Sequence, residues 1–163
     1  MGHWCHISLV LAIFISVLHL SSAQPQYEGE GNSPDDYVNQ HNCIRRVLNL
    51  QPLKWCDKLA QRAQAWADKR KDCELIHSEG GGENLAYGAD LNGLWAVQLW
   101  IDERLDYDHS KNECTAMCGH YTQVVWNTTE RVGCGKSKCD NGWANFVVCN
   151  YDPPGNYIGS YPY

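Results

Sequence analysis

The cysteines are the residues in this 163-residue chain whose type and spacing best suit chemistry. Two pairs are close in sequence, Cys114 with Cys118 and Cys134 with Cys139. Thiolates at such spacings resemble zinc knuckles, whereas an even number of cysteines in a small exported domain is typical of a disulfide framework. We expect disulfides, because thiols in an oxidising compartment pair with one another. The cysteines beyond Cys5 are Cys43, Cys56, Cys73, Cys114, Cys118, Cys134, Cys139 and Cys149.

The first residues of the chain predict export. Met1 to Ala23 contains no Lys, Arg, Asp or Glu, and its apolar run from Ile7 to Leu20 is followed by Ser21-Ser22-Ala23. A signal peptidase accepts only small side chains at these last positions. The run is also shorter than the roughly 20 apolar residues of a membrane anchor. We therefore predict a signal peptide over residues 1–23, cleaved after Ala23, and a secreted protein.

The charge of the chain excludes some partners. It carries 13 Lys and Arg against 19 Asp and Glu, a net charge of −6, and none of these residues lies in the predicted signal peptide. An acidic domain repels phosphate backbones and anionic lipid headgroups, which argues against a nucleic-acid partner. We expect no transmembrane segment in the secreted chain, and we expect one monomeric domain.

Familiar hydrolase motifs are absent from the sequence. Ser78 follows His77, which suggests an acyl-transfer pair, but no Gly-x-Ser-x-Gly elbow presents this serine. No His-Glu-x-x-His pair supplies the helical ligands of a zinc protease. Bridged cysteines leave no thiolate nucleophile. We therefore predict that the protein is not an enzyme.

Helical periodicity dominates the chain up to about residue 106. The first helix is predicted to begin at Ser33, with Pro34 at its first position and Asp36 completing a capping box. A second helix is predicted over 57–71 and a third over 92–106. Their predicted faces are Tyr37, His41, Ile44 and Leu48; Leu59, Ala63, Trp66 and Arg70; and Trp95, Leu99 and Asp102.

After Cys118 the pattern favours strands. Strands are predicted over 121–126, 131–138 and 144–151, the last one preceded by an Asn141-Gly142 turn. Helices followed by antiparallel strands predict an α+β domain. The polar segment 24–32 ahead of the first helix is predicted to be a flexible leader.

Four ordered motifs resemble the CAP superfamily, which comprises cysteine-rich secretory proteins, antigen 5 and pathogenesis-related proteins. The opening Ser33-Pro34-x-Asp36-Tyr37 and the Pro-Pro-Gly-Asn-Tyr near the end resemble its plant pathogenesis-related class-one branch. The resemblance covers residues 33–163. The four motifs are His77-Ser78, Gly82 to Ala86, Gly119 to Asn127 and Phe146 to Tyr157.

The resemblance implies a three-layer α-β-α sandwich around a short antiparallel sheet, as a CAP domain over 33–152 with a tail over 153–163. It also implies the bridges Cys73–Cys139, Cys114–Cys118 and Cys134–Cys149. Cys43 and Cys56 depart from the family pattern, and they fall on the first helix and at the start of the second. We predict a fourth bridge, Cys43–Cys56, worth about 2–4 kcal/mol. The other interpretation is two free thiols.

A cleft with two histidines and two glutamates is a further feature that the resemblance implies. Imidazole and carboxylate groups suit a divalent cation such as zinc, but they also satisfy one another as a hydrogen-bonded cluster that requires no cofactor. The metal interpretation carries an alternative function, a secreted metal-dependent hydrolase or protease with Glu83 or Glu103 as general base. The four residues are His77, Glu83, Glu103 and His120.

Binding is the function that we prefer on sequence grounds. Trp95, Trp100 and Tyr107 lie in or after the third helix, in a segment that resembles the loop through which family members are proposed to bind sterols. A sterol gains free energy by hiding apolar surface there, although aromatic residues equally fill cores. The resemblance implies a secreted plant defence protein of the apoplast or vacuole, with antifungal or anti-oomycete activity through sterol or lipid binding.

The C-terminal segment has a separate implied role. In plant relatives a closely similar eleven-residue tail is released by a processing protease as a defence-signalling peptide, and the corresponding junction here is Asp152-Pro153. The other interpretation is a proline-rich tail that wraps the domain. Upstream, Asn127-Thr128-Thr129 is an N-glycosylation sequon, so Asn127 is a candidate modification site.

Overall fold

The computed structural model describes residues 31–163, so the predicted signal peptide over 1–23 and residues 24–30 of the predicted leader lie outside the described residues. The helices are α1 (Pro34–Val47), α2 (Asp57–Lys69), α3 (Gly93–Asp102) and α4 (Gly119–Val124), with a 3₁₀ turn η1 (Glu103–Asp106). The strands are β1 (Lys54–Trp55), β2 (Glu83–Ala89), β3 (Tyr107–Asp108), β4 (Glu113–Cys114), β5 (Arg131–Lys138) and β6 (Ala144–Asp152).

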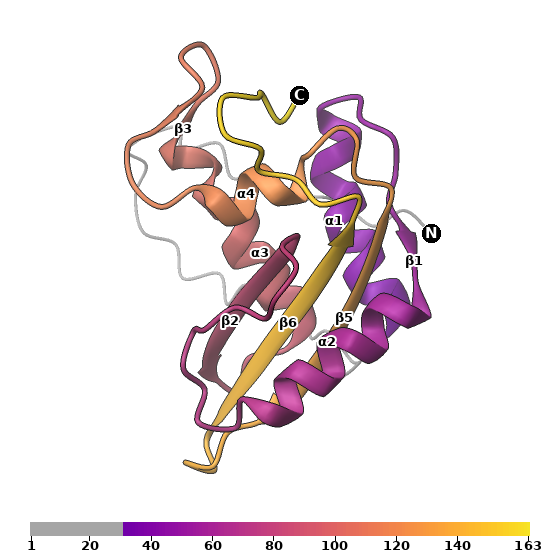
Figure 1. The fold of residues 1–163 in the computed structure, drawn as a ribbon, viewed down its shortest axis with the longest axis vertical. Helices are drawn as coiled ribbons and strands as arrows, with labels where there is room; N and C mark the ends of the chain where they lie inside the picture. The colour runs from indigo at the N-terminus through magenta and orange to yellow at the C-terminus, as the bar shows by residue number, and fades with distance from the viewer. Residues whose placement is uncertain (1–30) are drawn as a thin grey trace, which may run out of the picture.

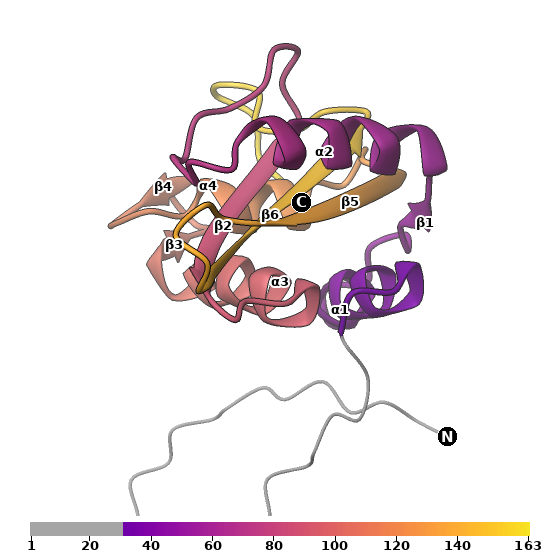
Figure 2. The same cartoon turned by 90° about the horizontal axis from the view of Figure 1, so that it is seen from below.

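These elements form three layers, as Figures 1 and 2 show. A four-stranded sheet in the order β1-β5-β6-β2 is the middle layer, with α2 on one face and α1 and α3 on the other. The α4 helix and the small β3–β4 hairpin lie beside this sandwich, next to the C-terminal tail. The predicted α-β-α sandwich is confirmed. The predicted all-antiparallel sheet is wrong at one edge, because β1 runs parallel to β5.

The first helix begins as the sequence predicted. The Ser33 hydroxyl accepts a hydrogen bond from the Asp36 backbone N–H, and the Asp36 carboxylate accepts one from the Ser33 N–H in return. Pro34 occupies the first turn, where its missing N–H costs nothing. All the signals for this start lie within four residues, so tertiary contacts are not needed to specify it.

The predicted strand over 121–126 is wrong, because most of this segment forms α4. Tyr121, Gln123 and Val124 turn inward from the short helix, and Thr122 donates its hydroxyl to the Gly119 carbonyl. Burial of these side chains overrides the local β preference of the valines and Thr122. The strand β2 was not predicted; it pairs with β6 from Glu83–Asn150 to Ala89–Ala144.

The residues that the sequence grouped on one face of the third helix, Trp95, Leu99 and Asp102, are all exposed in the structure. Trp95 is 58% exposed and Leu99 is 52% exposed, while Val97, Trp100 and Ile101 pack inward. The helix is apolar on nearly every side, so its hydrophobic pattern did not distinguish the two faces. It also ends at Asp102, and residues 103–106 continue as η1.

Two hydrophobic cores flank the sheet. The larger one lies between the sheet and the α1 and α3 helices, and it includes Tyr37, Trp100 and Val147. The smaller one lies under α2 and includes Ala63 and Phe146. Within residues 31–163, no helix has the length and apolarity that a bilayer span requires.

The three bridges that the resemblance implied are present: Cys73–Cys139, Cys114–Cys118 and Cys134–Cys149. The predicted Cys43–Cys56 bridge is wrong, because Cys56 has a free thiol. Cys43 is itself disulfide-bonded, without Cys56. In Figure 2, α1 and α2 lie on opposite faces of the sheet.

Candidate functional site

The first His–Glu pair lies at the start of β2. The Glu83 carboxylate accepts hydrogen bonds from His77 Nδ1 at 3.0 Å, from the Ser78 N–H at 2.8 Å and from the Ser78 hydroxyl at 2.5 Å. The carboxylate is 2% exposed, whereas the His77 imidazole is 58% exposed. Burial raises the pKa of Glu83, but the hydrogen bonds from His77 and Ser78 outweigh it, so the pKa lies below its usual value. Glu83 is therefore an ionised acceptor that organises its own loop.

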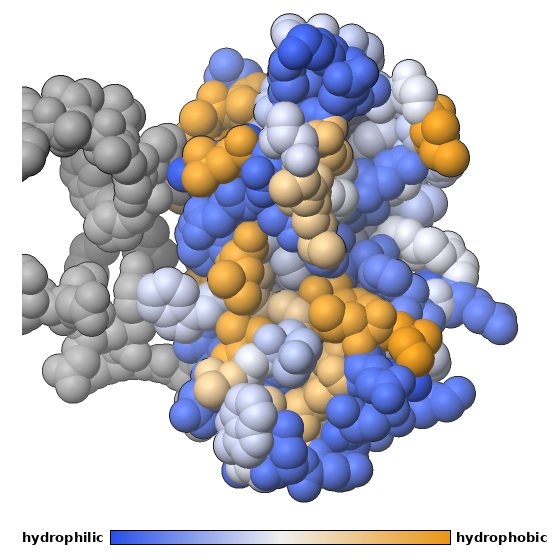
Figure 3. Space-filling model, turned by 90° about the vertical axis from the view of Figure 1, so that its left-hand side faces the viewer, coloured by the Kyte–Doolittle hydropathy of each residue, from blue (hydrophilic) through white to orange (hydrophobic). Residues whose placement is uncertain are grey.

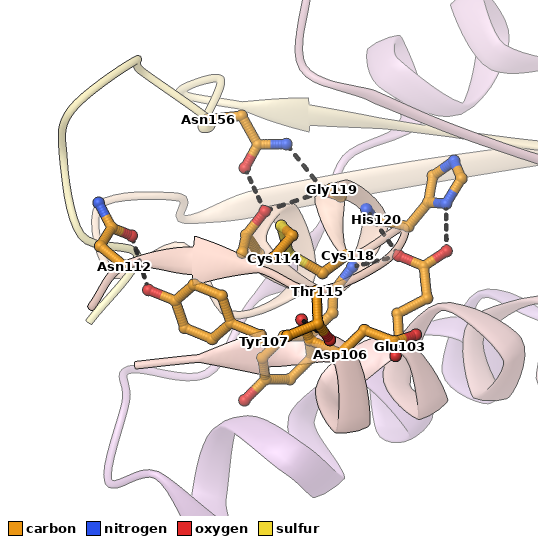
Figure 4. The surroundings of a disulfide bond; sticks show 12 residues. Glu103, Asp106, Tyr107, Asn112, Cys114, Thr115, Cys118, Gly119, His120 and Asn156 are labelled. Atoms are coloured by element: carbon orange, nitrogen blue, oxygen red, sulfur yellow. Dashed lines mark hydrogen bonds and ion pairs between the residues drawn. A yellow bond between two sulfur atoms is a disulfide. The ribbon is translucent and has the colours of Figure 1, made fainter. Parts of the chain in front are cut away.

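The second pair joins η1 to α4. Glu103 Oε1 accepts from His120 Nδ1 at 2.6 Å, and Oε2 accepts from the backbone N–H groups of His120 and Tyr121 at 3.0 and 3.2 Å (Figure 4). The residue before α4, Cys118, provides no side-chain cap. Glu103 therefore caps α4 from a different element, which satisfies two backbone donors that the helix leaves open.

A buried polar chain continues inward from His120. Its carbonyl accepts from the Asn84 amide at 3.0 Å, and the same amide donates to the Tyr151 hydroxyl at 3.2 Å. Tyr151 is 2.8 Å from His41 Nε2, and His41 Nδ1 is 2.8 Å from the Tyr37 carbonyl. A carbonyl only accepts, so Nδ1 carries the proton and Nε2 accepts from Tyr151. Burial lowers the pKa of His41 to about 4, so the ring is neutral at physiological pH.

The predicted set of His77, Glu83, Glu103 and His120 is thus divided into two hydrogen-bonded pairs. In the described part of the chain, no three His, Cys, Asp or Glu side chains come together as a possible metal site. Both carboxylates also accept N–H or O–H bonds at each of their oxygens. The arrangement does not fit a zinc ion held by all four residues.

The pairs also lack the geometry of a nucleophile and its base. The Ser78 hydroxyl donates to Glu83 and lies 3.4 Å from an Arg62 nitrogen, while its neighbour His77 is directed to the same Glu83 carboxylate. A serine nucleophile needs its proton to face a base that can carry it to a leaving group. Here the carboxylate instead fixes the serine and the histidine side by side.

The three aromatic residues predicted to bind a ligand are not brought together. Trp100 is buried in the larger core, where its indole N–H donates to the Leu85 carbonyl. Trp95 is exposed on α3, and Tyr107 is half-buried beside Tyr121. Figure 3 shows the face on the left of Figure 1, on the side of β3, with hydrophobic patches separated by hydrophilic residues. An open hollow elsewhere is lined by none of the predicted metal-binding or ligand-binding residues; it comprises Pro34, Trp55, Asp57, Ala60, Gln61, Gln64 and Cys134.

The predicted processing junction is part of the folded structure. Asp152 ends β6, where its carbonyl accepts from the Glu130 N–H and its carboxylate pairs with Arg131. The next carbonyl, that of Pro153, accepts from the Thr129 hydroxyl at 2.9 Å. The tail that follows returns along the domain, and Pro162 near its end is buried. This geometry agrees with the interpretation of a tail that wraps the domain.

The glycosylation candidate Asn127 lies in the turn between α4 and β5. It is exposed, and its backbone N–H donates to the Pro162 carbonyl at 2.7 Å. The sequon threonine, Thr129, is buried and bonded to the tail. Any glycan on Asn127 would therefore lie next to the C-terminal residues.

Sequence reasoning missed one side chain that holds this region in place. Arg45 is buried, and its guanidinium donates to the carbonyls of Val124, Trp126 and Thr129. Burial lowers the pKa of Arg45 to about 10, so it stays charged at neutral pH. An arginine near the end of a predicted helix gave no signal of this role. The position of His41 in an apolar stripe was a signal for the buried polar chain.

Comparisons with known proteins agree with this architecture. A family model described as "Cysteine-rich secretory protein family" (CAP) matches residues 38–151. "Pathogenesis-related leaf protein 4" of Solanum lycopersicum is 48% identical, over 97% of this chain and 98% of that protein. "Basic form of pathogenesis-related protein 1" of Nicotiana tabacum is 45% identical, over 96% of this chain and 88% of that protein. The structure of Schistosoma mansoni venom allergen-like protein 4 is 32% identical, with a TM-score of 0.64, over 78% of this chain and 90% of that chain. The chain therefore belongs to the cysteine-rich secretory protein (CAP) family, and within it to the plant pathogenesis-related class-one group.

Proposed function

We propose that this protein is a secreted plant defence protein that acts by binding and not by catalysis. The observation that carries the proposal is the bonding of the two carboxylates: Glu83 organises Ser78 and His77, and Glu103 caps α4. Groups held in this way stabilise the structure and leave no base directed at a substrate. The names of the relatives, which are pathogenesis-related proteins, support the defence role.

A sterol or related membrane lipid is the ligand that we propose. Trp95 and Leu99 are four residues apart on α3, and both are more than half exposed. Leu105, on η1, is 81% exposed. Such side chains gain about 25 cal/mol for each Å² of apolar surface that a ligand covers. Their exposure makes the outer side of α3 and η1 a better contact for an apolar ligand than the buried Trp100.

The test is a titration of the secreted protein with a fluorescent sterol. We expect saturable binding that Trp95→Ala and Leu99→Ala weaken. Trp143→Ala is the matched control, because Trp143 is equally exposed, at 57%, but lies at the turn before β6. Binding that all three variants leave unchanged would exclude the α3 surface. A parallel titration with a chelator tests the metal-dependent alternative, because a sterol site that needs zinc would stop binding sterol when the zinc is removed.

We also propose that the chain is the precursor of a C-terminal signalling peptide over residues 153–163. The last cysteine is Cys149, so a single cut after Asp152 would leave no covalent link to the body. Tyr157 is 57% exposed, and Ile158 is fully exposed, so part of the tail is open to a receptor or protease. The test is incubation with extracellular fluid of infected plants, followed by mass spectrometry for the free tail. Cleavage only at other bonds would contradict this role.

A further inference from the structure

The tail is held by side chains that the body directs at it, first near its beginning. Gln123 is 1% exposed, and its Oε1 accepts from the Gly155 backbone N–H at 2.9 Å. Its Nε2 donates to the Thr129 hydroxyl at 3.2 Å, and that hydroxyl donates to the Pro153 carbonyl at 2.9 Å. Two buried side chains therefore bond the main chain of the tail, which is a sequence-tolerant way to hold a peptide.

Shape completes this first anchor. A Cβ on Gly155 would lie 2.5 Å from the Trp126 ring, so only glycine lets the tail backbone approach the indole so closely. The next residue, Asn156, donates its amide to the Gly119 carbonyl at 2.8 Å and accepts from the Thr122 hydroxyl at 2.8 Å. Figure 4 shows the Asn156 side chain reaching α4 at Gly119. These contacts seat the beginning of the tail on α4.

A second anchor holds the last residues of the tail. The Tyr163 phenol is 3.1 Å from the Tyr121 hydroxyl, and its ring stacks on His109 with centroids 4.6 Å apart. His109 Nε2 donates to the main-chain oxygen of Tyr163 at 2.8 Å. Asn112, on the same hairpin, donates to the Ser160 carbonyl at 3.1 Å. Between the anchors, Ile158 is completely exposed.

The two anchors are parts of one platform. The first is built on α4 and the residues after it, whereas His109 and Asn112 belong to the β3–β4 hairpin. The Cys114–Cys118 disulfide joins the end of this hairpin to the residue before α4 (Figure 4). The body therefore presents a peptide site whose two halves are covalently tied, and residues 153–163 occupy it.

We propose that this platform, residues 107–129, is a peptide-binding site that retains the tail after the chain has been cut between Asp152 and Pro153. Release of the tail then needs a second event, the opening of the anchors. The inference rests on the proposed precursor function only for the place of the cut. It assigns to the body a further activity, the storage of a cleaved peptide that has a central exposed segment and is bonded to the body near both ends.

The experiment uses the full secreted chain with a site-specific protease sequence inserted between Asp152 and Pro153. After complete cutting, the protein is passed through a membrane that holds back the body but not a free peptide, and mass spectrometry measures the tail on both sides. We expect the tail to stay with the body. A tail that passes through at once, while circular dichroism shows a folded body, would overturn the proposal.

Variants in the tail test which contacts retain it without risk to folding of the body. Tyr163→Ala removes the stacked, partly buried side chain at the end of the tail, and Asn156→Ala removes the α4 contact, so each should accelerate loss of the tail at least tenfold. Ile158→Ala is the matched control and should leave the rate unchanged, because this side chain contacts nothing that hides it from water. Equal rates for all three variants would overturn the two-anchor site. The added protease cuts at the inserted sequence, so the retention assay does not depend on a plant protease. Failure of the tail to be retained is therefore a separate result from failure of the natural cleavage.

Discussion

The two His–Glu pairs contain the same chemical groups but are built into different surroundings. At the first pair, the His77 ring is mostly exposed and its Glu83 partner bonds only to the adjoining loop. At the second, both side chains are at most 20% exposed, and Glu103 also bonds two backbone groups of α4. The first pair therefore fixes a surface loop, whereas the second fixes a helix on which other parts of the molecule depend.

The two pairs also differ in how far their hydrogen bonds extend into the rest of the molecule. Beyond His120, the polar chain through Asn84 and Tyr151 reaches His41 in the larger core. On its other side, α4 carries the first anchor of the tail. His77 has no comparable connection among the hydrogen bonds of the described residues. The same two residue types therefore form a pair at two places in this chain, and the fold gives each pair a separate structural role.

The largest expected effect comes from acid and concerns the chain behind His120. His41 has a folded pKa of about 4 against an ordinary value of 6.5, so the unfolded state takes up a proton first as the pH falls. Stability is complete above pH 6.5 and declines toward pH 4, by about 3 kcal/mol for a shift of this size. Urea unfolding between pH 7 and 4 measures it.

His41→Gln is the matched variant, because glutamine does not titrate. It should lose stability at pH 7 by breaking the bonds to Tyr37 and Tyr151, yet show a flatter decline between pH 6.5 and 4. If the variant and the unmodified protein lose unfolding free energy equally between pH 6.5 and 4, His41 is not the source of that loss. Acid would then act through carboxylates alone.

The second expected effect separates the two pairs directly. Glu103→Gln replaces one of the two acceptor oxygens by an N–H₂ donor, so the side chain can no longer accept from both His120 Nδ1 and the backbone N–H groups of α4. We expect a loss of about 2 kcal/mol in unfolding free energy. Thermal and urea unfolding measure it, with Glu79→Gln as a surface control. The retention assay should show faster loss of the tail in this variant. An unchanged rate would show that the Glu103 cap does not contribute to retention of the tail.

The elements that the sequence predicted well are those whose signals are local. Helix α1 has its cap, its Pro34 and its acidic first turn within a few residues, and β6 follows a turn with a positive φ at Gly142. The elements that were missed depend on distant partners. Helix α4 is capped by Glu103 from 17 residues away, and β2 is a strand because β6 lies beside it.

The site divides in the same way. The resemblance identified His77, Glu83, Glu103 and His120 as residues that matter, but their separation into two pairs is a property of the folded chain. Nothing in the sequence marks Gln123 or Thr129 as holding the tail, because a polar residue on a short apolar segment has many possible roles. Trp100 and Trp95 are indistinguishable by type, and only packing makes one core and the other surface.

A smaller effect is expected at the first pair. Glu83→Gln should cost about 1 kcal/mol, since the loop bonds that it loses are local and water can replace some of them. The pKa of Glu83 is lowered in the fold, so its contribution is present above the ordinary value of 4.5 and is lost as the pH falls through the lowered folded value. Hydrogen exchange at the Ser78 amide, which donates to Glu83, measures how often this loop opens. A loss larger than that of Glu103→Gln would reverse the ranking of the two pairs.

The smallest expected effect is that of a divalent metal. A ligand that binds only the folded state at 100 times its dissociation constant stabilises it by about 2.7 kcal/mol, so a site shared by the two pairs would raise the melting temperature visibly when zinc is added. Because the carboxylate oxygens already accept hydrogen bonds and the two pairs are separate, we expect neither zinc nor a chelator to shift the melting temperature. A zinc-dependent rise that His77→Ala and His120→Ala both abolish would show that the pairs rearrange to share an ion. A rise abolished by only one of these variants would place the metal at that pair alone, and the difference between the two pairs would then extend to metal binding.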